Sequence, residues 1–320
     1  QDRGTNVSPD VKTAASLGLK CLILDLRGNG GGILDQAVEI ADEFLDGDKL
    51  ITYTEGKHVD KKEYRCRRNG QFETGKLVVL ADEGTASASE ILIGALQDWD
   101  RATIVGRRSF GKGLVQEQFD LSDKSALRLT IARYYTPIGR SIQRPYTNGE
   151  RAYYDEVSNR YHDPETTYAD SVKNNSGKAY KTKGGKTVYA KGGIAPDYFI
   201  AMDTSGFSKN SAAIYNKSTI SSFAYNFYLQ NQALIKTFKS PADFIKGFSL
   251  SDENWKQFTD AAAKDSINIS IVSAKEKSSL SNQIRSSIAR QIWRNEGYFE
   301  VINTTDEGIK KALEIIETNK

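Results

Sequence analysis

Short apolar runs alternate with helix-like periodicity over the first part of the chain. Residues 20–26 (KCLILDL) and 76–81 (KLVVLA) are compact and mostly apolar, which is typical of strands buried on both faces. Between them, apolar residues of the stretch 33–45 recur at the spacing of an amphipathic helix. Strand and helix in alternation predict an α/β core. The same criteria predict a helix over 90–99 and strands over 102–105 and 126–135.

The pattern changes twice further along the chain. From about residue 145 to 191 the sequence is rich in Tyr, Asn, Lys, Gly and Asp without a sustained period, so we interpret it as a long irregular insertion. Beyond residue 206 the pattern becomes helical, and apolar residues repeat every four positions from Leu280 to Ile292. The sequence therefore predicts a domain over residues 1–205 and a separate, mostly helical domain over 206–320.

The composition argues against several function classes. The 44 basic and 41 acidic residues leave a formal charge of +3, with both signs spread along the chain, so nothing predicts a nucleic-acid or anionic-membrane partner. No run of about 18 apolar residues occurs, so no segment is predicted to span a bilayer. Residue 1 is Gln and the single methionine is Met202, so we expect a processed or trimmed piece of a longer protein.

Cysteine and histidine are scarce in this chain. Cys21 and Cys66 are too few for a disulfide framework or a metal site. Cys21 lies in an apolar run and is expected to be buried and inert, whereas Cys66 lies among arginines that could lower its pKa. His58 and His162 both lie in polar stretches, and we expect them at the surface.

The first candidate site is the glycine cluster of residues 26–32 (LRGNGGG), which follows a predicted strand and precedes a predicted helix. Glycines allow a close approach of the backbone to a ligand, and successive amides near a helix N-terminus form an anion-binding concavity. A dinucleotide-binding fingerprint would need glycine at the position of Ile33, so that interpretation fails. An oxyanion hole and a plain tight turn remain as the two interpretations.

The second candidate is residues 106–113 (GRRSFGKG), which nearly match a phosphate-binding P-loop. The residue that should be Ser or Thr to hold magnesium is Gly113, so the match fails where the chemistry needs it. Lys112, which lies between two glycines, is then either a solvated turn lysine or a lysine with a specific role.

The third candidate is residues 85–90 (TASASE), at a predicted strand-to-helix junction. A serine at such a junction presents its hydroxyl at the sheet edge, with the following amides free to donate. The alternative is an N-cap serine. Ser89 with Glu90 could provide that cap, which leaves Ser87 in need of another role.

A serine nucleophile needs a base. Neither histidine is excluded by its position in the sequence, because triads are assembled in space, but both are expected at the surface, and a lysine is the alternative. A lysine can take this part only when its amine is neutral. At the ordinary lysine pKa near 10.4, holding the amine neutral at pH 7 costs roughly 4–5 kcal/mol. Burial away from carboxylates lowers a lysine pKa by several units, so Lys112, between glycines and close to buried strands, is the candidate base.

These three segments, in this order, resemble the C-terminal processing peptidases (tail-specific proteases), a family of serine peptidases with a Ser–Lys dyad. The resemblance covers about residues 18–203, and the helical tail resembles the C-terminal region of some members. The motifs that carry it are residues 25–32 (DLRGNGGG), 83–91 (EGTASASEI), 95–98 (ALQD), 105–106 (VG), 109–113 (SFGKG), 115–116 (VQ), 132–137 (ARYYTP), 139–142 (GRSI) and 192–197 (GGIAPD).

Carried over residue by residue, the resemblance implies that Ser87 is the nucleophile and that Lys112 is its general base. Gln116 matches the glutamine that hydrogen-bonds to the lysine amine and orients it. The residue type fits this role, because a neutral oxygen can orient an amine without favouring its charged form. An aspartate at that position would raise the lysine pKa and disarm the base.

The resemblance also implies an oxyanion hole. The amide of Ala88 would be one donor, and a glycine of the Gly30–Gly31 pair the other, with Gly31 favoured. Glu90 and Asp98 match family positions that we expect to support the site or the fold without taking part in the reaction. For Asp98, the role of a polar residue at a helix end is an equally good interpretation.

The family implies a crotonase-like (ClpP-like) α/β catalytic core that needs no cofactor and no metal. It also implies protein substrates with unstructured, apolar C-terminal ends, and a periplasmic or other cell-envelope location. Members usually carry a PDZ domain before the catalytic core. Residues 1–17 are too short for one, so a PDZ domain is expected in the full-length protein, and a homo-oligomer is left open.

Two other classes of function share this fold. A non-catalytic ligand-binding or scaffold module would have no reason to keep Ser87, Lys112 and Gln116 together. An acyl-CoA enzyme of the crotonase type uses two oxyanion amides but has no use for a paired serine and lysine. The sequence therefore favours a serine endopeptidase that cleaves proteins near their C-terminal ends.

Overall fold

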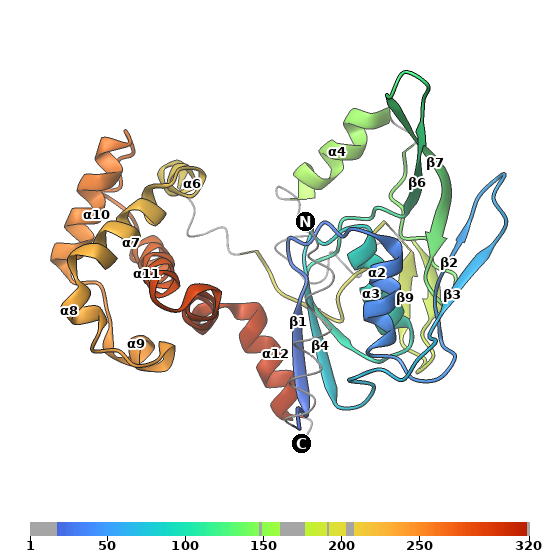
Figure 1. Cartoon of the computed structure of the whole chain (residues 1–320), viewed down its shortest axis with the longest axis horizontal. Helices are drawn as coiled ribbons and strands as arrows, with labels where there is room; N and C mark the ends of the chain where they lie inside the picture. The colour runs from blue at the N-terminus through green and yellow to red at the C-terminus, as the bar shows by residue number, and fades with distance from the viewer. Residues whose placement is uncertain (1–17, 147–148, 161–176, 191, 203–207, 319–320) are drawn as a thin grey trace. The chain divides into compact units, whose positions relative to one another are not determined.

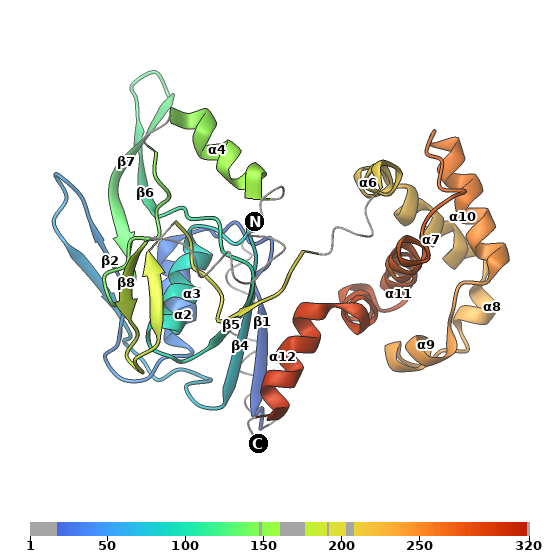
Figure 2. The ribbon, with the colours of Figure 1, turned by 180° about the vertical axis from the view of Figure 1, so that it is seen from behind.

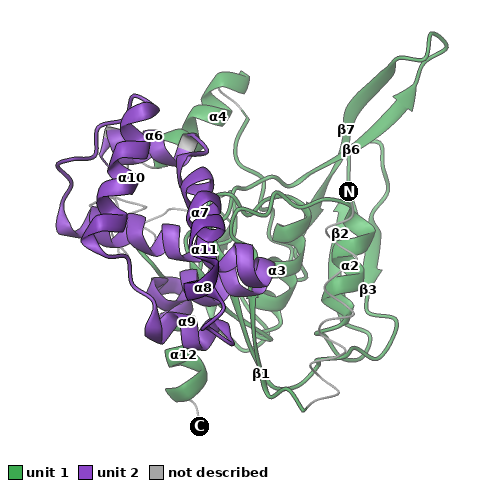
Figure 3. Cartoon of the chain, turned by 60° about the vertical axis from the view of Figure 1, so that its left-hand side comes forward, with its two compact units in different colours: residues 1–202, 311–320 green, residues 203–310 purple. Residues whose placement is uncertain are grey.

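A computed structural model describes residues 18–146, 149–160, 177–190, 192–202 and 208–318. The chain divides into two compact units, which are coloured separately in Figure 3. Unit 1 consists of Gln1–Met202 together with Lys311–Lys320, and unit 2 consists of Asp203–Lys310. Each unit has a hydrophobic core of its own.

Unit 1 contains a parallel sheet with the strand order β1-β4-β5-β10. Its strands are β1 (Cys21–Asp25), β4 (Lys76–Ala81), β5 (Thr103–Gly106) and β10 (Tyr198–Phe199). β4 is an internal strand and is buried from its second residue onward, as its apolar run predicts. β1 is only half-buried, because it lies at the sheet edge, so the prediction that it is covered on both faces is wrong.

A second, antiparallel sheet has the strand order β3-β2-β7-β6. Its strands are β2 (Leu50–Glu55), β3 (Lys62–Arg65), β6 (Leu114–Asp120) and β7 (Ala126–Tyr135). Of these four strands only β7 is predicted above. β3 and β6 mix charged and apolar residues, whereas β2 (LITYTE) is mostly buried and has one charged residue, so its sequence is compatible with a strand. Residues 116–130 of the β6–β7 hairpin are all exposed, and the hairpin projects from unit 1 in Figure 3.

Helix α3 (Ala88–Asp98) lies between the two sheets, and α2 (Leu34–Asp42) packs beside it (Figures 1 and 2). Every residue of α3 is buried, as expected of a helix that is covered on all sides. The indole N–H of Trp99, directly after α3, donates to the carbonyl oxygen of Leu50 at 2.8 Å. This bond anchors the C-terminal end of α3 to β2.

The stretch 145–191 contains regular structure, so the prediction of an irregular insertion is wrong for its described residues. They form helix α4 (Gly149–Arg160) and an antiparallel hairpin of β8 (Lys178–Lys181) and β9 (Thr187–Ala190). Only Tyr153 and Arg160 of α4 are buried, so no apolar period marks this helix in the sequence.

Unit 2 is helical, as the repeating apolar positions predict. Its core is dominated by phenylalanines and isoleucines, among them Phe244, Phe258 and Ile284. No helix among the described residues is long and apolar enough to cross a membrane. The elements after residue 207 are α6 (Lys209–Asn216), α7 (Thr219–Gln230), α8 (Gln232–Ile235), α9 (Pro241–Gly247), α10 (Asp252–Lys264), α11 (Ala274–Ile302), the 3-10 helix η2 (Asn303–Thr305) and α12 (Glu307–Thr318), which continues into unit 1.

Candidate active site

The three candidate segments meet at the carboxyl ends of the parallel strands. Because the strands are parallel, the loops that follow β1, β4 and β5 leave the sheet on the same side. The Thr85 hydroxyl donates to the Leu26 carbonyl oxygen at 2.8 Å, and the Ala86 N–H donates to the Asn29 carbonyl oxygen at 3.0 Å. The Phe110 N–H donates to the Thr85 carbonyl oxygen at 2.8 Å. These bonds join all three loops.

Ser87 occupies a strained turn between β4 and α3. Its dihedral angles are φ 57° and ψ −118°, a region that non-glycine residues avoid at a cost of order 1–3 kcal/mol. Its N–H donates to Glu90 Oε2 at 2.9 Å, which holds the turn. Ser87 is itself the N-cap residue of α3, with Glu90 as its capping-box partner, so the suggestion that Ser89 provides the cap is wrong. A strand, a sharp turn and a helix in this order are also the arrangement that presents a nucleophilic serine in some hydrolases.

Glu90 is fully buried and binds the segments of both Ser87 and Lys112. Its carboxylate accepts hydrogen bonds from the N–H of Gly111 at 2.7 Å, the N–H of Lys112 at 2.8 Å and the Ser109 hydroxyl at 2.6 Å. Burial raises the pKa of the Glu90 carboxyl above its ordinary value, while these hydrogen bonds act in the opposite direction. The carboxylate therefore connects the start of α3 to the loop after β5.

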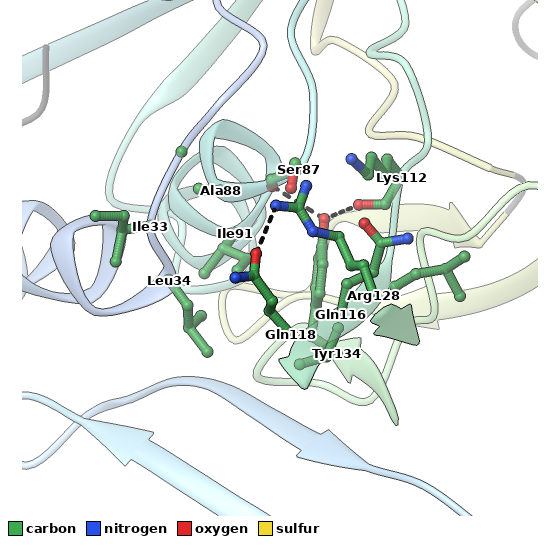
Figure 4. Close-up of a pocket in the computed structure, with 13 residues that line it drawn as sticks. Ile33, Leu34, Ser87, Ala88, Ile91, Lys112, Gln116, Gln118, Arg128 and Tyr134 are labelled. Atoms are coloured by element: carbon green, nitrogen blue, oxygen red, sulfur yellow. Dashed lines mark hydrogen bonds between the residues drawn. The ribbon is translucent and has the colours of Figure 1, made fainter. Parts of the chain in front are cut away.

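Tyr134 of β7 contacts the carbonyl groups of Ser87 and Lys112, two of the residues whose N–H groups Glu90 accepts. Its hydroxyl lies 3.0 Å from the carbonyl oxygen of Ser87 and also hydrogen-bonds to that of Lys112 (Figure 4). Burial and the nearby Glu90 raise the pKa of Tyr134 well above its ordinary value, so the hydroxyl keeps its proton at neutral pH. Ser87 and Lys112 are thus connected through both their N–H and their carbonyl groups.

Ser87 and Lys112 are half-buried and line one pocket of about 490 Å³ (Figure 4). Within the described chain, no hydrogen bond joins the Ser87 hydroxyl to the Lys112 amine. Lys112 and Arg128 are the only charged side chains among the described residues that line the pocket. The apolar part of the wall comes from Ile33, Leu34, Ala88, Ile91, Leu114 and Val115.

Gly31 packs directly against the start of α3. Its φ is 79°, and a Cβ built on it would lie 2.5 Å from the Ala86 carbonyl oxygen and 2.6 Å from the Ala88 nitrogen, so a side chain does not fit. The Gly31 N–H donates to Asn29 Oδ1 at 2.9 Å. The N–H groups of Gly30 and Ala88 have no hydrogen-bond partner among the described residues.

Gln116 lines the same pocket as Lys112, with an exposed side chain. It follows an irregularity in the pairing of β6 with β7, between Val115 and Gln116. In the part of the chain that the structure describes, Gln116 makes no side-chain hydrogen bond to the Lys112 amine. The structure therefore brings the two side chains into one pocket without joining them.

Asp98 lies at the opposite end of α3 from Ser87 and does not line the pocket. It is fully buried, forms an ion pair with Arg140 and accepts a hydrogen bond from the Ile138 N–H at 3.2 Å. Burial raises the pKa of Asp98, and the charge of Arg140 opposes this shift. These contacts favour the interpretation that Asp98 supports the fold.

The remaining polar candidates lie away from the pocket. His58 is exposed, as expected, and His162 lies outside the described residues. The suggestion that neighbouring arginines lower the pKa of Cys66 is wrong, because burial and Asp42 raise it to about 12. Cys21 is half-buried in β1. No cluster of His, Cys, Asp and Glu suited to a metal ion occurs among the residues that the structure describes.

Asn29 and Tyr134 connect segments of the site, and the sequence pattern did not indicate either role. The Asn29 side chain accepts hydrogen bonds from the Gly31 N–H and, at 3.0 Å, from the Ser89 hydroxyl, so it links the glycine turn to α3. Both residues belong to motifs on which the family resemblance rests, and that is the one signal that could have singled them out. Their contacts join segments far apart in the sequence, so spacing alone does not reveal them.

Residues 4–149 match the model of Peptidase family S41, and residues 211–294 match a family of unknown function, DUF8443. The chain is 47% identical over 125 residues to a carboxy-terminal-processing protease of Bartonella bacilliformis, covering 39% of this chain and 29% of that protein. A carboxyl-terminal-processing protease of Synechocystis sp. is 46% identical over 123 residues, or 38% and 28% of the two chains.

Among solved structures, the chain is similar to a photosystem II D1 C-terminal processing protease. The TM-score is 0.44 at 28% identity, covering 62% of this chain and 39% of that one. The chain spans less than a third of the length of the curated relatives described above. The match to the model of peptidase family S41 thus includes both Ser87 and Lys112.

Proposed function

We propose that this chain is the catalytic part of a serine endopeptidase that cleaves proteins near their C-terminal ends. Ser87 is the nucleophile and Lys112 is the general base. The observation that carries the proposal is the pair of backbone links, through Glu90 and through Tyr134, that hold these two residues at one pocket. The names of the curated relatives support the C-terminal preference.

The proposed reaction has two halves. The Ser87 oxygen attacks the carbonyl carbon of the scissile peptide bond, while the Lys112 amine accepts the hydroxyl proton. When the C–N bond breaks, the lysine returns that proton to the departing amine. A water molecule then attacks the acyl-enzyme ester, again with Lys112 as base, and Ser87 recovers its proton as the acid product leaves. The site therefore needs an oxyanion hole that serves both halves.

We assign the oxyanion hole to the N–H groups of Ala88 and of the Gly30–Gly31 pair. The close approach of the Gly31 backbone to Ala88 supports this, since a Cβ built on Gly31 would lie only 2.6 Å from the Ala88 nitrogen. Asn29 already accepts the Gly31 N–H, whereas the Gly30 N–H has no partner among the described residues. Gly30 is therefore the glycine donor available without rearrangement, and Gly31 becomes available only when its bond to Asn29 is exchanged.

Gln116 is proposed to orient the Lys112 amine once a substrate is bound. Both side chains line the pocket, and a rotation of the Gln116 side chain is the step that the role requires. As a neutral acceptor, the amide oxygen would hold the amine without favouring its protonated form. Glu90 serves as the buried anchor of the dyad backbone, and Asp98 supports the far end of the helix.

The pocket wall supports the proposed class of substrate. Its apolar side chains suit the apolar, unstructured C-terminal ends expected for this family. Arg128 is a cation with no acidic side chain among the described residues that line the pocket, so a carboxylate on the substrate would meet a complementary charge there.

The wider context of the protein is part of the same proposal. We assign unit 1 to a crotonase-like (ClpP-like) catalytic core, with the domain division near residue 205 and an insertion over about residues 145–191 that contains α4, β8 and β9. A PDZ domain elsewhere in the full-length protein would capture the substrate terminus. The expected location is the periplasm or cell envelope, and a homo-oligomer is compatible with all of these assignments.

A fluorophosphonate probe tests the proposed nucleophile and base. Wild type should be labelled on Ser87, and Ser87→Ala should lose all labelling. Lys112→Ala should lower peptide hydrolysis by at least about 10²-fold, the usual contribution of a general base, with unit 1 still folded. The matched controls are Ser125→Ala and Lys57→Ala, two residues with no place in the pocket.

Each outcome of this experiment separates the candidate functions. Labelling that persists in Ser87→Ala removes Ser87 from the mechanism, and full hydrolysis by Lys112→Ala removes the proposed base. A folded wild-type protein that neither reacts with the probe nor cleaves unstructured peptides would instead be the non-catalytic ligand-binding or scaffold module. Turnover of acyl-CoA without turnover of peptide would indicate the crotonase-type alternative.

A further inference from the structure

Helix α4 contacts the backbone of the loop that leads to Lys112. The Arg160 guanidinium, which is 3% exposed, donates to the carbonyl oxygens of Ser109 at 2.8 Å and Phe110 at 3.3 Å. A longer contact of 3.4 Å reaches the carbonyl oxygen of Arg108. One side chain from α4 thus holds three successive carbonyl groups that end two residues before Lys112.

Glu156 holds Arg160 in place together with two other arginines. Its carboxylate accepts hydrogen bonds from Arg160 at 2.9 and 3.0 Å, from Arg108 at 2.9 Å and from Arg144 at 2.6 Å. The three guanidinium groups come from three different segments: α4, the loop after β5 and the irregular segment that precedes α4. A carboxylate shared by three buried arginines fixes these segments relative to one another.

Arg144 extends the same contacts to the residue next to Lys112. Its guanidinium lies between the rings of Phe110 and Tyr153, at 4.1 and 4.0 Å from their centroids. Its backbone N–H donates to the Gly111 carbonyl oxygen at 3.0 Å. A Cβ built on Gly111 would lie 2.5 Å from Arg144 Cγ, so the Arg144 side chain packs directly against the Gly111 backbone.

The loop before Lys112 is therefore held from two sides. Glu90 accepts the N–H groups of Gly111 and Lys112 from within the core. Arg160 and Arg144 hold the carbonyl groups of the preceding residues from the side of α4. A proton acceptor must stay within a fraction of an ångström of its working position, and a misplacement of about 1 Å costs about 10²-fold in rate.

We infer that Glu156 and Arg160 of α4 are positioning residues for Lys112: they hold the backbone of residues 108–111, and so the amine, where Ser87 can use it. We call Glu156 with Arg108, Arg144 and Arg160 the α4 clamp. The inference rests on the proposed function of Lys112. In this role the insertion that follows the catalytic segments contributes to catalysis through the position of Lys112, and α4 itself does not contact the substrate.

The test compares two clamp variants with two matched controls on the same helix. Glu156→Gln and Arg160→Gln each remove one charge from the clamp. Asp155→Asn and Arg151→Gln remove the same charges from a neighbouring surface pair, whose side chains are 58% and 96% exposed. Kinetics on an unstructured peptide and amide hydrogen exchange over residues 108–113 are measured for all four variants and wild type.

Both clamp variants should lower kcat by about 10- to 100-fold with little change in KM, because α4 does not line the substrate pocket. Hydrogen exchange over residues 108–113 should become faster, while exchange in α3 stays as in wild type. The two controls should match wild type in both measurements. Unchanged exchange over 108–113, or faster exchange with unchanged kcat, would overturn the inference.

Two further measurements keep the result unambiguous. If Glu156→Gln fails to unfold cooperatively, Glu156→Asp takes its place, since it keeps the charge but shortens the reach, and a smaller loss of kcat is then expected. Wild-type protein that cleaves no peptide contradicts the proposed function itself. In that case, hydrogen exchange still decides whether α4 holds this segment: exchange over residues 108–113 should be faster in the clamp variants and unchanged in the controls.

Discussion

The backbone N–H of Lys112 donates to the carboxylate of Glu90 at 2.8 Å across 22 residues of sequence. The same carboxylate accepts the Ser87 N–H, and the Tyr134 hydroxyl contacts the carbonyl oxygens of both Ser87 and Lys112. The two residues proposed to react are thus fixed through their backbones. Their side chains stay free to exchange partners while their Cα atoms keep a constant separation, as a reacting pair requires.

Glu90→Gln should destabilise unit 1 and abolish peptide hydrolysis. The amide NH₂ would replace an acceptor with a donor, opposite backbone N–H groups that then lack a partner. Each buried donor left unsatisfied costs about 1–3 kcal/mol. Urea unfolding, followed by Trp99 fluorescence in a Trp255→Phe, Trp293→Phe background, measures the loss in unit 1.

The control for this change is Glu83→Gln. Glu83 is also buried and bonds to Arg107 at 2.7 Å, but it does not line the pocket. Its replacement should cost stability with a much smaller effect on kcat. Equal loss of kcat in the two variants would contradict a specific link between Glu90 and the dyad.

Tyr134→Phe should lower kcat with little change in KM, because it removes the hydroxyl that contacts both dyad carbonyls. The loss of one net hydrogen bond should reduce the free energy of unfolding by about 0.5–1.5 kcal/mol. Tyr135→Phe is the neighbouring control, since the Tyr135 hydroxyl makes no hydrogen bond among the described residues. Identical kinetics of the two variants would remove Tyr134 from the site.

Gly31→Ala should destabilise unit 1 and prevent turnover. The new Cβ would lie 2.5 Å from the Ala86 carbonyl oxygen, so the glycine turn or the start of α3 has to move. Gly185→Ala serves as control, because Gly185 has φ +90° but open space around it. The difference in unfolding free energy between the two variants isolates the steric clash from the backbone strain, and no difference would mean that the turn adapts freely.

Arg128 should make the enzyme favour substrates that carry a carboxylate. Two peptides that differ only by Glu or Gln near the scissile bond are compared, and a second pair carries a free or amidated C-terminus. Wild type should favour the charged member of at least one pair by about fivefold, as expected for a charge-assisted contact worth about 1 kcal/mol at an exposed site.

Arg128→Gln should remove that preference, whereas Arg133→Gln, an exposed arginine of the same strand that does not line the pocket, should retain it. The comparison of the two peptide pairs tells a side-chain carboxylate from a terminal one. A preference that persists in Arg128→Gln would show that another group selects the charge.

Glu156 should make unit 1 sensitive to acid. Burial tends to raise the pKa of its carboxyl, but Arg160, Arg144 and Arg108 lower it to about 2 from an ordinary value of 4.5. Because the folded-state pKa is the lower one, the stabilisation is complete above about pH 4.5 and is lost as the pH falls toward about 2. Urea unfolding across this range should show wild type converging on Glu156→Gln at low pH.

Other acidic groups titrate in the same pH range, but their effects on the unfolding free energy are the same in wild type and in Glu156→Gln and cancel in the difference. Glu276 in unit 2 is one, since hydrogen bonds from Ser273, Ser208 and Ser211 lower its pKa to about 2 in both proteins. A stability difference between wild type and Glu156→Gln that stays constant down to pH 2 would contradict the low pKa of Glu156.

Much of unit 1 could be predicted from the sequence, because its core elements carry a clear periodicity. The apolar run of β4 predicts a buried strand, and the spacing before and after it predicts α2 and α3. The strands β3 and β6 and the helix α4 escape prediction, since their side chains are largely polar or exposed. Their positions depend on partners elsewhere in the chain, which no local pattern records.

The residue types needed for the chemistry can be recognised without a structure: a serine after a strand, a glycine-flanked lysine and a glycine turn, in the order of one peptidase family. The folded chain was needed to show that Glu90, Tyr134 and Asn29 join these segments, and that the Gly31 N–H already has a partner. The two kinds of information differ in range along the chain. Periodicity reports contacts within one element, whereas the site is assembled from hydrogen bonds between loops that leave three different strands.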